Sequence, residues 1–170
     1  PGHCGSFDTV ERLIHGSRRY VITFTDVYSR FSLAWATTSH ASLAAKEFFD
    51  LTAFLFPFKL TNVLTDNGSE FMKHFDLELK RLHLTHWHTY PKTPKMNAHC
   101  ERFNRSIQEE YVDYHANELL TPSKFNAGLM KYLIWFNTER PHWGLKLKTP
   151  TQFITTNFPK ECNMYLTNTR

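Results

Sequence analysis

The chain has 170 residues, of which 41% are apolar, and this length suits one well-buried domain better than two. It carries 20 Lys and Arg against 16 Asp and Glu, and the formal net charge of +4 suits a polyanionic partner. The three cysteines are too few and too widely spaced for a disulfide framework, which indicates a reducing compartment. No apolar run reaches the length of a membrane span, so we expect no membrane partner and a cytoplasmic location.

The first part of the chain predicts an antiparallel meander followed by a helix. A first strand is expected near residues 6–10, and the β-branched and aromatic residues of 20–25 and 31–37 predict a hairpin. From Ser42 to Pro57 the apolar residues recur at helical spacing, with Ser42 as the candidate N-cap. This segment is typical of a crossover helix.

The remaining elements alternate between strands and helices. A short strand ends near Asp66, a helix follows over residues 71–82, and residues 84–89 alternate as a fifth strand. Two helices come last, one from about Asn97 and one from Pro122. The order βββαβαβαα predicts an α/β fold, a five-stranded mixed sheet with helices on both faces. We expect residues 1–157 to form the domain and 158–170 to be a tail or the start of a further segment.

Two acidic residues lie at the ends of predicted elements. Asp66 follows a run of strand-forming residues and precedes Asn67-Gly68, a turn signal, so it is expected at the carboxyl end of a strand. Glu101 lies near the start of the helix that begins at about Asn97, on a different face from the apolar stripe of that helix. Taken alone, an acid at such a position is most often a solvated charge.

A third acid near these two is not decided by composition or periodicity. Asp8 lies on the first predicted strand, and Asp26 lies in the turn-like segment before Arg30. In a turn of this kind a carboxylate commonly accepts hydrogen bonds from turn amides or pairs with a nearby Arg. The residues by themselves leave both aspartates open.

Two blocks of sequence resemble a known family. Thr65–Phe71 reads Thr-Asp-Asn-Gly-Ser-Glu-Phe, and Pro91–Arg105 contains Asn-Ala-His-Cys-Glu-Arg-Phe-Asn-Arg. Both resemble the catalytic core of the insertion-sequence transposases related to retroviral integrases, the DDE class. The 34 residues between Asp66 and Glu101 are one fewer than is usual in that family. The resemblance covers roughly residues 7–153 and implies a ribonuclease H-like fold.

The resemblance implies a metal-dependent polynucleotidyl transferase that cleaves transposon DNA ends and transfers the strands into target DNA. It places the first catalytic aspartate on the first strand, so the implied catalytic and metal-binding residues are Asp8, Asp66 and Glu101. Three carboxylates with a DNA phosphate can hold two Mg²⁺ ions, with Mn²⁺ as a substitute. The partner is double-stranded DNA of the nucleoid, and pairing two ends implies a homodimer or larger oligomer.

Basic and amide side chains surround Glu101 and predict contact with DNA phosphates, with weak sequence specificity. The candidates are Lys92, Lys95, Asn97, Arg102, Asn104 and Arg105. The segment 136–142 resembles the end of the family's core, where Arg140 is expected to be mainly structural. A zinc site is the less favoured interpretation of the histidines at 83, 86, 88 and 99 with Cys100, because their spacings match no zinc motif.

Two other functions fit the same residues. One is a catalytically silent DNA-binding module of the same fold, although the presence of all three acids argues against it. The other is a ribonuclease H-like nuclease without strand transfer, which uses the same chemistry. Only the products separate the nuclease from a transposase, because a nuclease never yields joined strands.

Overall fold

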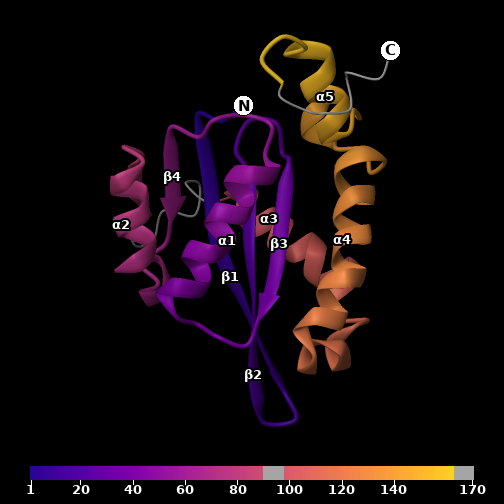
Figure 1. Ribbon diagram of the computed structural model, residues 1–170. Coiled ribbons are helices and arrows are strands. Elements are labelled where there is room, and N and C mark those ends of the chain that lie inside the picture. The colour runs from indigo at the N-terminus through magenta and orange to yellow at the C-terminus, as the bar shows by residue number, and fades with distance from the viewer. Residues whose placement is uncertain (90–97, 163–170) are drawn as a thin grey trace.

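A mixed five-stranded sheet forms the centre of the computed structural model, which describes residues 1–89 and 98–162 (Figure 1). The strand order is β3-β2-β1-β4-β5. β1 pairs antiparallel with β2 and parallel with β4, which places β1 at the centre of the sheet. The strands are β1 (Cys4–Ile14), β2 (Ser17–Asp26), β3 (Ser32–Thr37), β4 (Asn62–Thr65) and β5 (Thr85–His88). The predicted sheet is therefore confirmed.

β1 and β2 form a hairpin, and each of the two strands is longer than the sequence pattern predicts. Its ladder continues to the pair Ile14 and Ser17, and the hairpin extends beyond the rest of the sheet in Figure 1. The two turn residues, His15 and Gly16, both have positive φ, at 47° and 77°. Such a two-residue turn matches the twist of an antiparallel pair, which lets the ladder continue to the tip.

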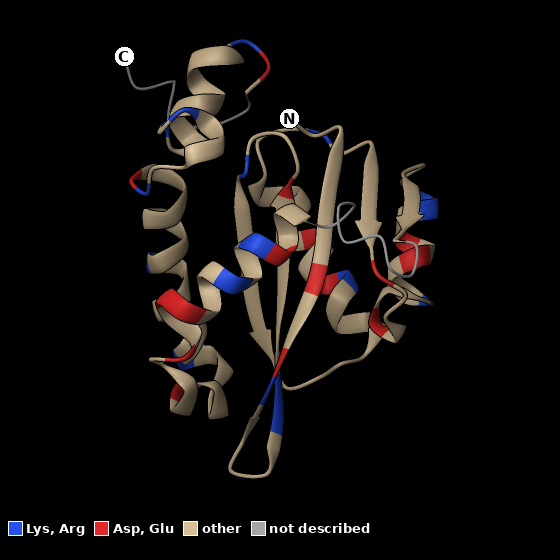
Figure 2. Ribbon diagram, turned by 180° about the vertical axis from the view of Figure 1, so that it is seen from behind, with Lys and Arg blue, Asp and Glu red and all other residues tan. Residues whose placement is uncertain are grey.

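Helices cover both faces of the sheet, as predicted (Figures 1 and 2). The sequence pattern predicted nine strands and helices. The structure adds a fifth α-helix, over Pro150–Asn157, which the pattern did not indicate. The helices are α1 (Ser42–Leu55), α2 (His74–Arg81), α3 (Ala98–Ile107), α4 (Pro122–Thr138) and α5 (Pro150–Asn157). None of the helices in the described part of the chain is long and apolar enough to cross a membrane.

Ser42 does not cap α1, contrary to the sequence-based expectation. The N-cap position is Ala41, and Ser42 is already inside the helix. Its hydroxyl donates to the carbonyl of Met72 and accepts from the backbone N–H of Phe75 at 3.1 Å. Ser42 therefore holds the start of α2 against α1.

Two separate apolar clusters lie on opposite faces of the sheet. Phe7 and Phe24 pack with α1 and α2, whereas Val10 and Val21 pack with α3 and α4. Because successive residues of a strand face opposite sides, Asp8 faces α3 while Phe7 is buried under α1. The alternation of β1 thus directs one acidic side chain toward the helix that carries Glu101.

The helix that carries Glu101 changes its winding where the sequence pattern predicts a regular continuation. After Ile107 the chain forms one π turn over Gln108–Val112. Helical spacing predicts that Tyr111 and Tyr114 both belong to the buried stripe of this helix; Tyr111 is buried, but Tyr114 is 80% exposed, so the prediction for Tyr114 is wrong. The extra residue of a π turn rotates the following side chains, which moves Tyr114 away from the core.

Two asparagines of α4 satisfy the backbone of the edge strand β3. Asn126 accepts from the N–H of Ala36 at 2.8 Å and donates to its carbonyl at 2.9 Å. Asn137 does the same at Ser32, at 2.9 and 2.8 Å. Both side chains are only 4% exposed, so they replace the neighbouring strand that this edge lacks.

We expect Asn126→Ala to lower the free energy of unfolding by about 2–4 kcal/mol, because it leaves two backbone groups of Ala36 unpaired in a buried site. Urea denaturation measures the loss. Asn157→Ala is the matched control, since that side chain is exposed and only donates to the carbonyl of Phe153. Equal losses in the two variants would contradict the role assigned to Asn126.

Candidate active site

The pairing of β1 with β4 brings Asp8 and Asp66 together. The last pair in the parallel ladder is Ser6 with Leu64, and two residues further on each strand reaches an aspartate. Neighbouring strands are about 4.8 Å apart, so the two backbones are adjacent at this point. Asp66 is exposed and directly follows β4, at the carboxyl end of the strand, as the sequence predicts.

Hydrogen bonds on both carboxylate oxygens fix the orientation of Asp8. The N–H of Thr9 donates to one oxygen and the amide of Asn104 donates to the other, both at 2.8 Å. The Asn104 carbonyl oxygen in turn accepts from the hydroxyl of Thr23 at 2.7 Å. Each carboxylate oxygen of Asp8 keeps one lone pair for a further ligand.

The packing of α3 on the sheet positions Glu101. Cys100 is fully buried, and its sulfur lies 3.7 Å from the hydroxyl of Thr23 and 3.8 Å from the carbonyl of Ser6. With Cys100 and Asn104 both turned to the sheet, Glu101 lies at the edge of this contact and is exposed. Figure 2 shows α3 across the sheet, with acidic and basic residues along it.

The charges of three other acids act on Asp8. The pKa of Asp8 is raised from 3.8 to about 6, mainly by burial and in smaller part by the charges of Asp66, Glu70 and Glu101, while the Thr9 hydrogen bond lowers it. Carboxylates in such a cluster form the oxygen-rich, negatively charged environment that suits Mg²⁺. Within residues 1–89 and 98–162, no three His, Cys, Asp or Glu side chains lie close enough together to hold a metal ion. One Asp66 oxygen instead accepts from the N–H of Gly68 at 2.9 Å.

Glu70 is an acidic residue near the site that the sequence analysis did not single out. It is only 4% exposed, and one of its oxygens lies 3.0 Å from the imidazole of His40. The other oxygen is buried without a hydrogen-bond partner. A Cβ atom at Gly68 would overlap the carboxylates of Glu70 and Asp66, so a side chain there would require these two acids to shift. The available signal was the acid within Gly-Ser-Glu-Phe, directly after Asp66.

Asp26 has the structural role expected of a turn aspartate. It is fully buried, and one carboxylate oxygen accepts from the N–H of Gly2 at 2.9 Å. The other accepts from the N–H and the hydroxyl of Ser29, at 2.7 and 2.6 Å. These bonds hold the turn between β2 and β3, so both carboxylate oxygens of Asp26 serve to stabilise that turn.

The predicted DNA-binding residues have different environments. Arg102 and Arg105 are exposed on α3, whereas Asn104 is 7% exposed and bonded to Asp8 and Thr23. Its burial argues for positioning of Asp8 in place of a DNA contact. The other candidates, Lys92, Lys95 and Asn97, lie outside the described residues.

The histidines considered for zinc have other contacts. His86 lies 2.9 Å from the hydroxyl of Thr65 and 3.2 Å from the carboxylate of Asp76. Cys100 belongs to the interface of α3 with the sheet. These residues hold β4, β5, α2 and α3 in place.

Solved structures with this fold are catalytic cores of retroviral integrases. The HTLV-2 integrase catalytic core domain in complex with magnesium, in a trimeric form, is 19% identical with a TM-score of 0.72, over 90% of this chain and 96% of that chain. The catalytic core domain of BIV integrase is 17% identical with a TM-score of 0.72, over 94% of this chain and 99% of that chain. The fold is therefore the ribonuclease H-like fold of integrase cores.

Sequence comparison gives the family. A family model described as the integrase core domain matches residues 1–94, and a second integrase core domain model matches residues 82–150. The chain belongs to the integrase core domain family. It is also 26% identical over 152 residues to the integrase candidate ORF3 of Spiroplasma virus SpV1-C74, which covers 79% of this chain. The match spans only 41% of that viral protein.

The raised pKa of Asp8 predicts how stability depends on pH in metal-free protein. Because the folded pKa, about 6, lies above the ordinary 3.8, this contribution to stability is complete below about pH 4 and is lost as the pH rises through 6. Asp8→Asn cannot ionise and should lack this loss, so it should gain up to about 3 kcal/mol over the wild type between pH 4 and 8.

Urea denaturation in the presence of a chelator measures this difference. Glu109→Gln, which removes an exposed carboxylate beyond α3, should follow the wild-type curve. Parallel curves for wild type and Asp8→Asn would show that Asp8 has no unusual electrostatic environment.

Proposed function

We propose that this domain is the catalytic core of a DNA transposase, which cleaves transposon ends and transfers the freed strands into target DNA. The observation that carries the proposal is the half-buried Asp8 carboxylate, oriented by Thr9 and Asn104, whose pKa is raised mainly by burial and in smaller part by the charges of Asp66, Glu70 and Glu101. Membership of the integrase core domain family supports the reaction class. The match spans 41% of the viral relative, so the activity of a whole protein is part of the proposal.

Asp8, Asp66 and Glu101 are the proposed metal-binding residues, and they would hold two Mg²⁺ ions, with Mn²⁺ as a substitute. All three offer carboxylate oxygens, and the HTLV-2 core of the same fold was solved in complex with magnesium. When bound, such ions activate water or a 3′-hydroxyl and offset charge on the leaving oxygen. Asp66 and Glu101 are exposed, so a DNA strand can reach them.

Other residues of the chain orient the acids and bind DNA. Asn104 and Thr9 fix both oxygens of Asp8, so the carboxylate does not have to reorganise when the site assembles. Arg102 and Arg105 lie on the exposed side of α3 and would contact phosphates on either side of the attacked bond. Lys92, Lys95 and Asn97 remain proposed DNA contacts, and the DNA would be that of the cytoplasmic nucleoid.

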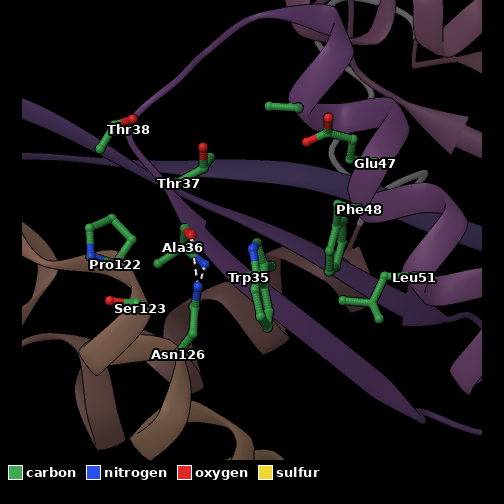
Figure 3. Close-up of a pocket in the computed structure, with 11 residues that line it drawn as sticks. Trp35, Ala36, Thr37, Thr38, Glu47, Phe48, Leu51, Pro122, Ser123 and Asn126 are labelled. Atoms are coloured by element: carbon green, nitrogen blue, oxygen red, sulfur yellow. Dashed lines mark hydrogen bonds between the residues drawn. The ribbon is translucent and has the colours of Figure 1, made fainter.

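An exposed apolar pocket supports the proposal that the domain forms a homodimer or a larger oligomer. A pocket of about 470 Å³ opens between β3, α1 and the start of α4. Figure 3 shows Trp35 of β3 between Leu51 of α1 and Pro122 of α4. Trp35 is 37% exposed and Phe54, further along α1, is 78% exposed. We propose that a second copy covers this apolar face, and the HTLV-2 core has been solved in dimeric and trimeric forms.

We expect Glu101→Gln and Asp66→Asn to lower the rates of both cleavage and strand joining to below about one-thousandth of wild type, because each removes a charged metal ligand. The assay uses labelled duplexes that carry a transposon end, with Mg²⁺ or Mn²⁺. Glu109→Gln is the control, and it should retain full activity. Retained activity in Glu101→Gln would remove it from the catalytic set.

The products of the same assay separate the proposed function from its two rivals. Joined strands support a transposase, whereas cleaved strands alone indicate a nuclease of this fold. DNA binding without cleavage in wild type, with either metal, would indicate a silent binding module.

We expect Trp35→Glu to weaken self-association by at least about tenfold, since it places a charge in the apolar centre of the proposed interface. Sedimentation velocity over a range of concentrations measures the dissociation constant. Trp143→Glu is the matched control, because Trp143 is 86% exposed but lies after α4, away from this pocket. Dissociation of the control variant alone would place the interface elsewhere.

A further inference from the structure

A second pocket, on the other flank of α3 from Glu101, is lined by basic residues. It has a volume of about 620 Å³ and lies between the end of β2, the start of β3, α3 and the segment after α4. Its α3 residues include His99, Arg102 and Ser106, which share one side of the helix at spacings of three and four. Three further ionisable residues complete its basic lining: Arg30, Arg140 and His142.

Two side-chain nitrogens of residues that line this pocket are buried without a hydrogen-bond partner in the described part of the chain. They are Nη1 of Arg30 and Nε2 of His142. Buried donors are nearly always paired in folded proteins, and an unpaired one costs free energy. Nη1 of Arg30 is always a donor, so it is the group of this pocket that lacks an acceptor.

The positive charge of the pocket is only partly neutralised within the described part of the chain. Arg140 is paired with Glu110, whose carboxylate its Nε approaches at 3.1 Å and its Nη2 at 2.5 Å. Arg30 and Arg102 have no such partner there. The charge of Asp26 offsets part of the charge of Arg30, although the Asp26 oxygens accept their hydrogen bonds from Gly2 and Ser29. An anion is therefore the complementary ligand.

The titration behaviour of the lining residues agrees with this charge balance. Burial lowers the pKa of His99, and the nearby charge of Arg30 lowers it further. Burial also lowers the pKa of His142, together with the charge of Arg140. Both imidazoles thus lie in a positive environment, and the His142 ring hydrogen-bonds to the backbone of Phe136.

The backbone at Arg30 is strained in a way that keeps this side chain in place. Arg30 has φ of 63°, in the left-handed region that a glycine adopts without cost. The turn is fixed by the N–H of Arg30, which donates to the carbonyl of Asp26 at 3.0 Å, and by the bonds that the Asp26 carboxylate accepts. A strained arginine with an unpaired guanidinium nitrogen is an outlier that points to function.

We propose that this pocket binds one backbone phosphate of DNA that crosses α3, held by Arg30 and Arg102. The inference rests on the proposed function, since it identifies where the DNA is anchored on the side of α3 away from the acids. A guanidinium fork matches two phosphate oxygens, and exposed Arg102 and Arg105 continue the path across the helix. The contact carries no sequence information, because a phosphate is common to every nucleotide.

The test is fluorescence anisotropy of a labelled duplex in the presence of a chelator, so that binding is measured without cleavage. Arg30→Gln and Arg102→Gln should each weaken binding about tenfold and reduce the slope of log affinity against log salt by about one. Lys131→Gln removes an equal charge from an exposed position on α4, and its affinity should equal that of wild type. Equal affinities in all three variants would overturn the proposal.

A second arm identifies the phosphate itself. Duplexes in which single phosphates are replaced by neutral methylphosphonates should include one position that weakens wild-type binding but has no further effect on Arg102→Gln. If every position weakens wild type and Arg102→Gln equally, the pocket does not bind the backbone. Because Arg102 is exposed, this arm does not depend on a variant that disturbs the fold.

Thermal unfolding without DNA distinguishes a DNA-binding role of Arg30 from a structural role of the same residue. Arg30→Gln should raise the midpoint, because it removes a partly buried charge with an unpaired donor. A lower midpoint would mean that Arg30 serves the fold. Failure of the proposed function gives a different result from failure of this inference. If only the proposed function fails, wild type still binds DNA through this pocket but shows no metal-dependent cleavage.

Discussion

The parallel pairing of β1 with β4 is the constraint on which the site depends. Asp8 and Asp66 are far apart in sequence, and the strand register alone makes them neighbours. A slip of one residue would turn Asp8 to the opposite face, under α1, where Phe7 now packs among aromatic rings. The apolar packing of Phe7 therefore fixes the direction of the acidic side chain beside it.

Packing also fixes the position of α3, because the residues that hold this helix to the sheet also orient the acids. Cys100 and Phe103 bury one side of the helix, and Asn104 links that side to Asp8. The opposite flank carries the basic pocket, so one helix separates negative charge from positive charge. This arrangement suits a partner that needs both metal ions at one bond and phosphate contacts beyond it.

Much of the fold followed from local sequence, and the site followed only in part. Alternation and helical spacing predicted the sheet and four helices, whereas the choice between Asp8 and Asp26 came from the family resemblance and not from the residues themselves. The π turn after α3 and the contact of Ser42 with α2 depend on tertiary packing, which periodicity does not encode. Asn104 illustrates the limit, because its spacing from Glu101 was visible in the sequence but its burial against Asp8 was not.

The central claim is that Asp8, Asp66 and Glu101 together bind divalent metal. The most direct measurement is anomalous scattering from crystals of this domain grown with Mn²⁺. The account predicts strong anomalous peaks within coordination distance of all three carboxylates, in wild type but not in Glu101→Gln. Peaks at other residues, or three carboxylates that stay apart in the presence of Mn²⁺, would contradict it.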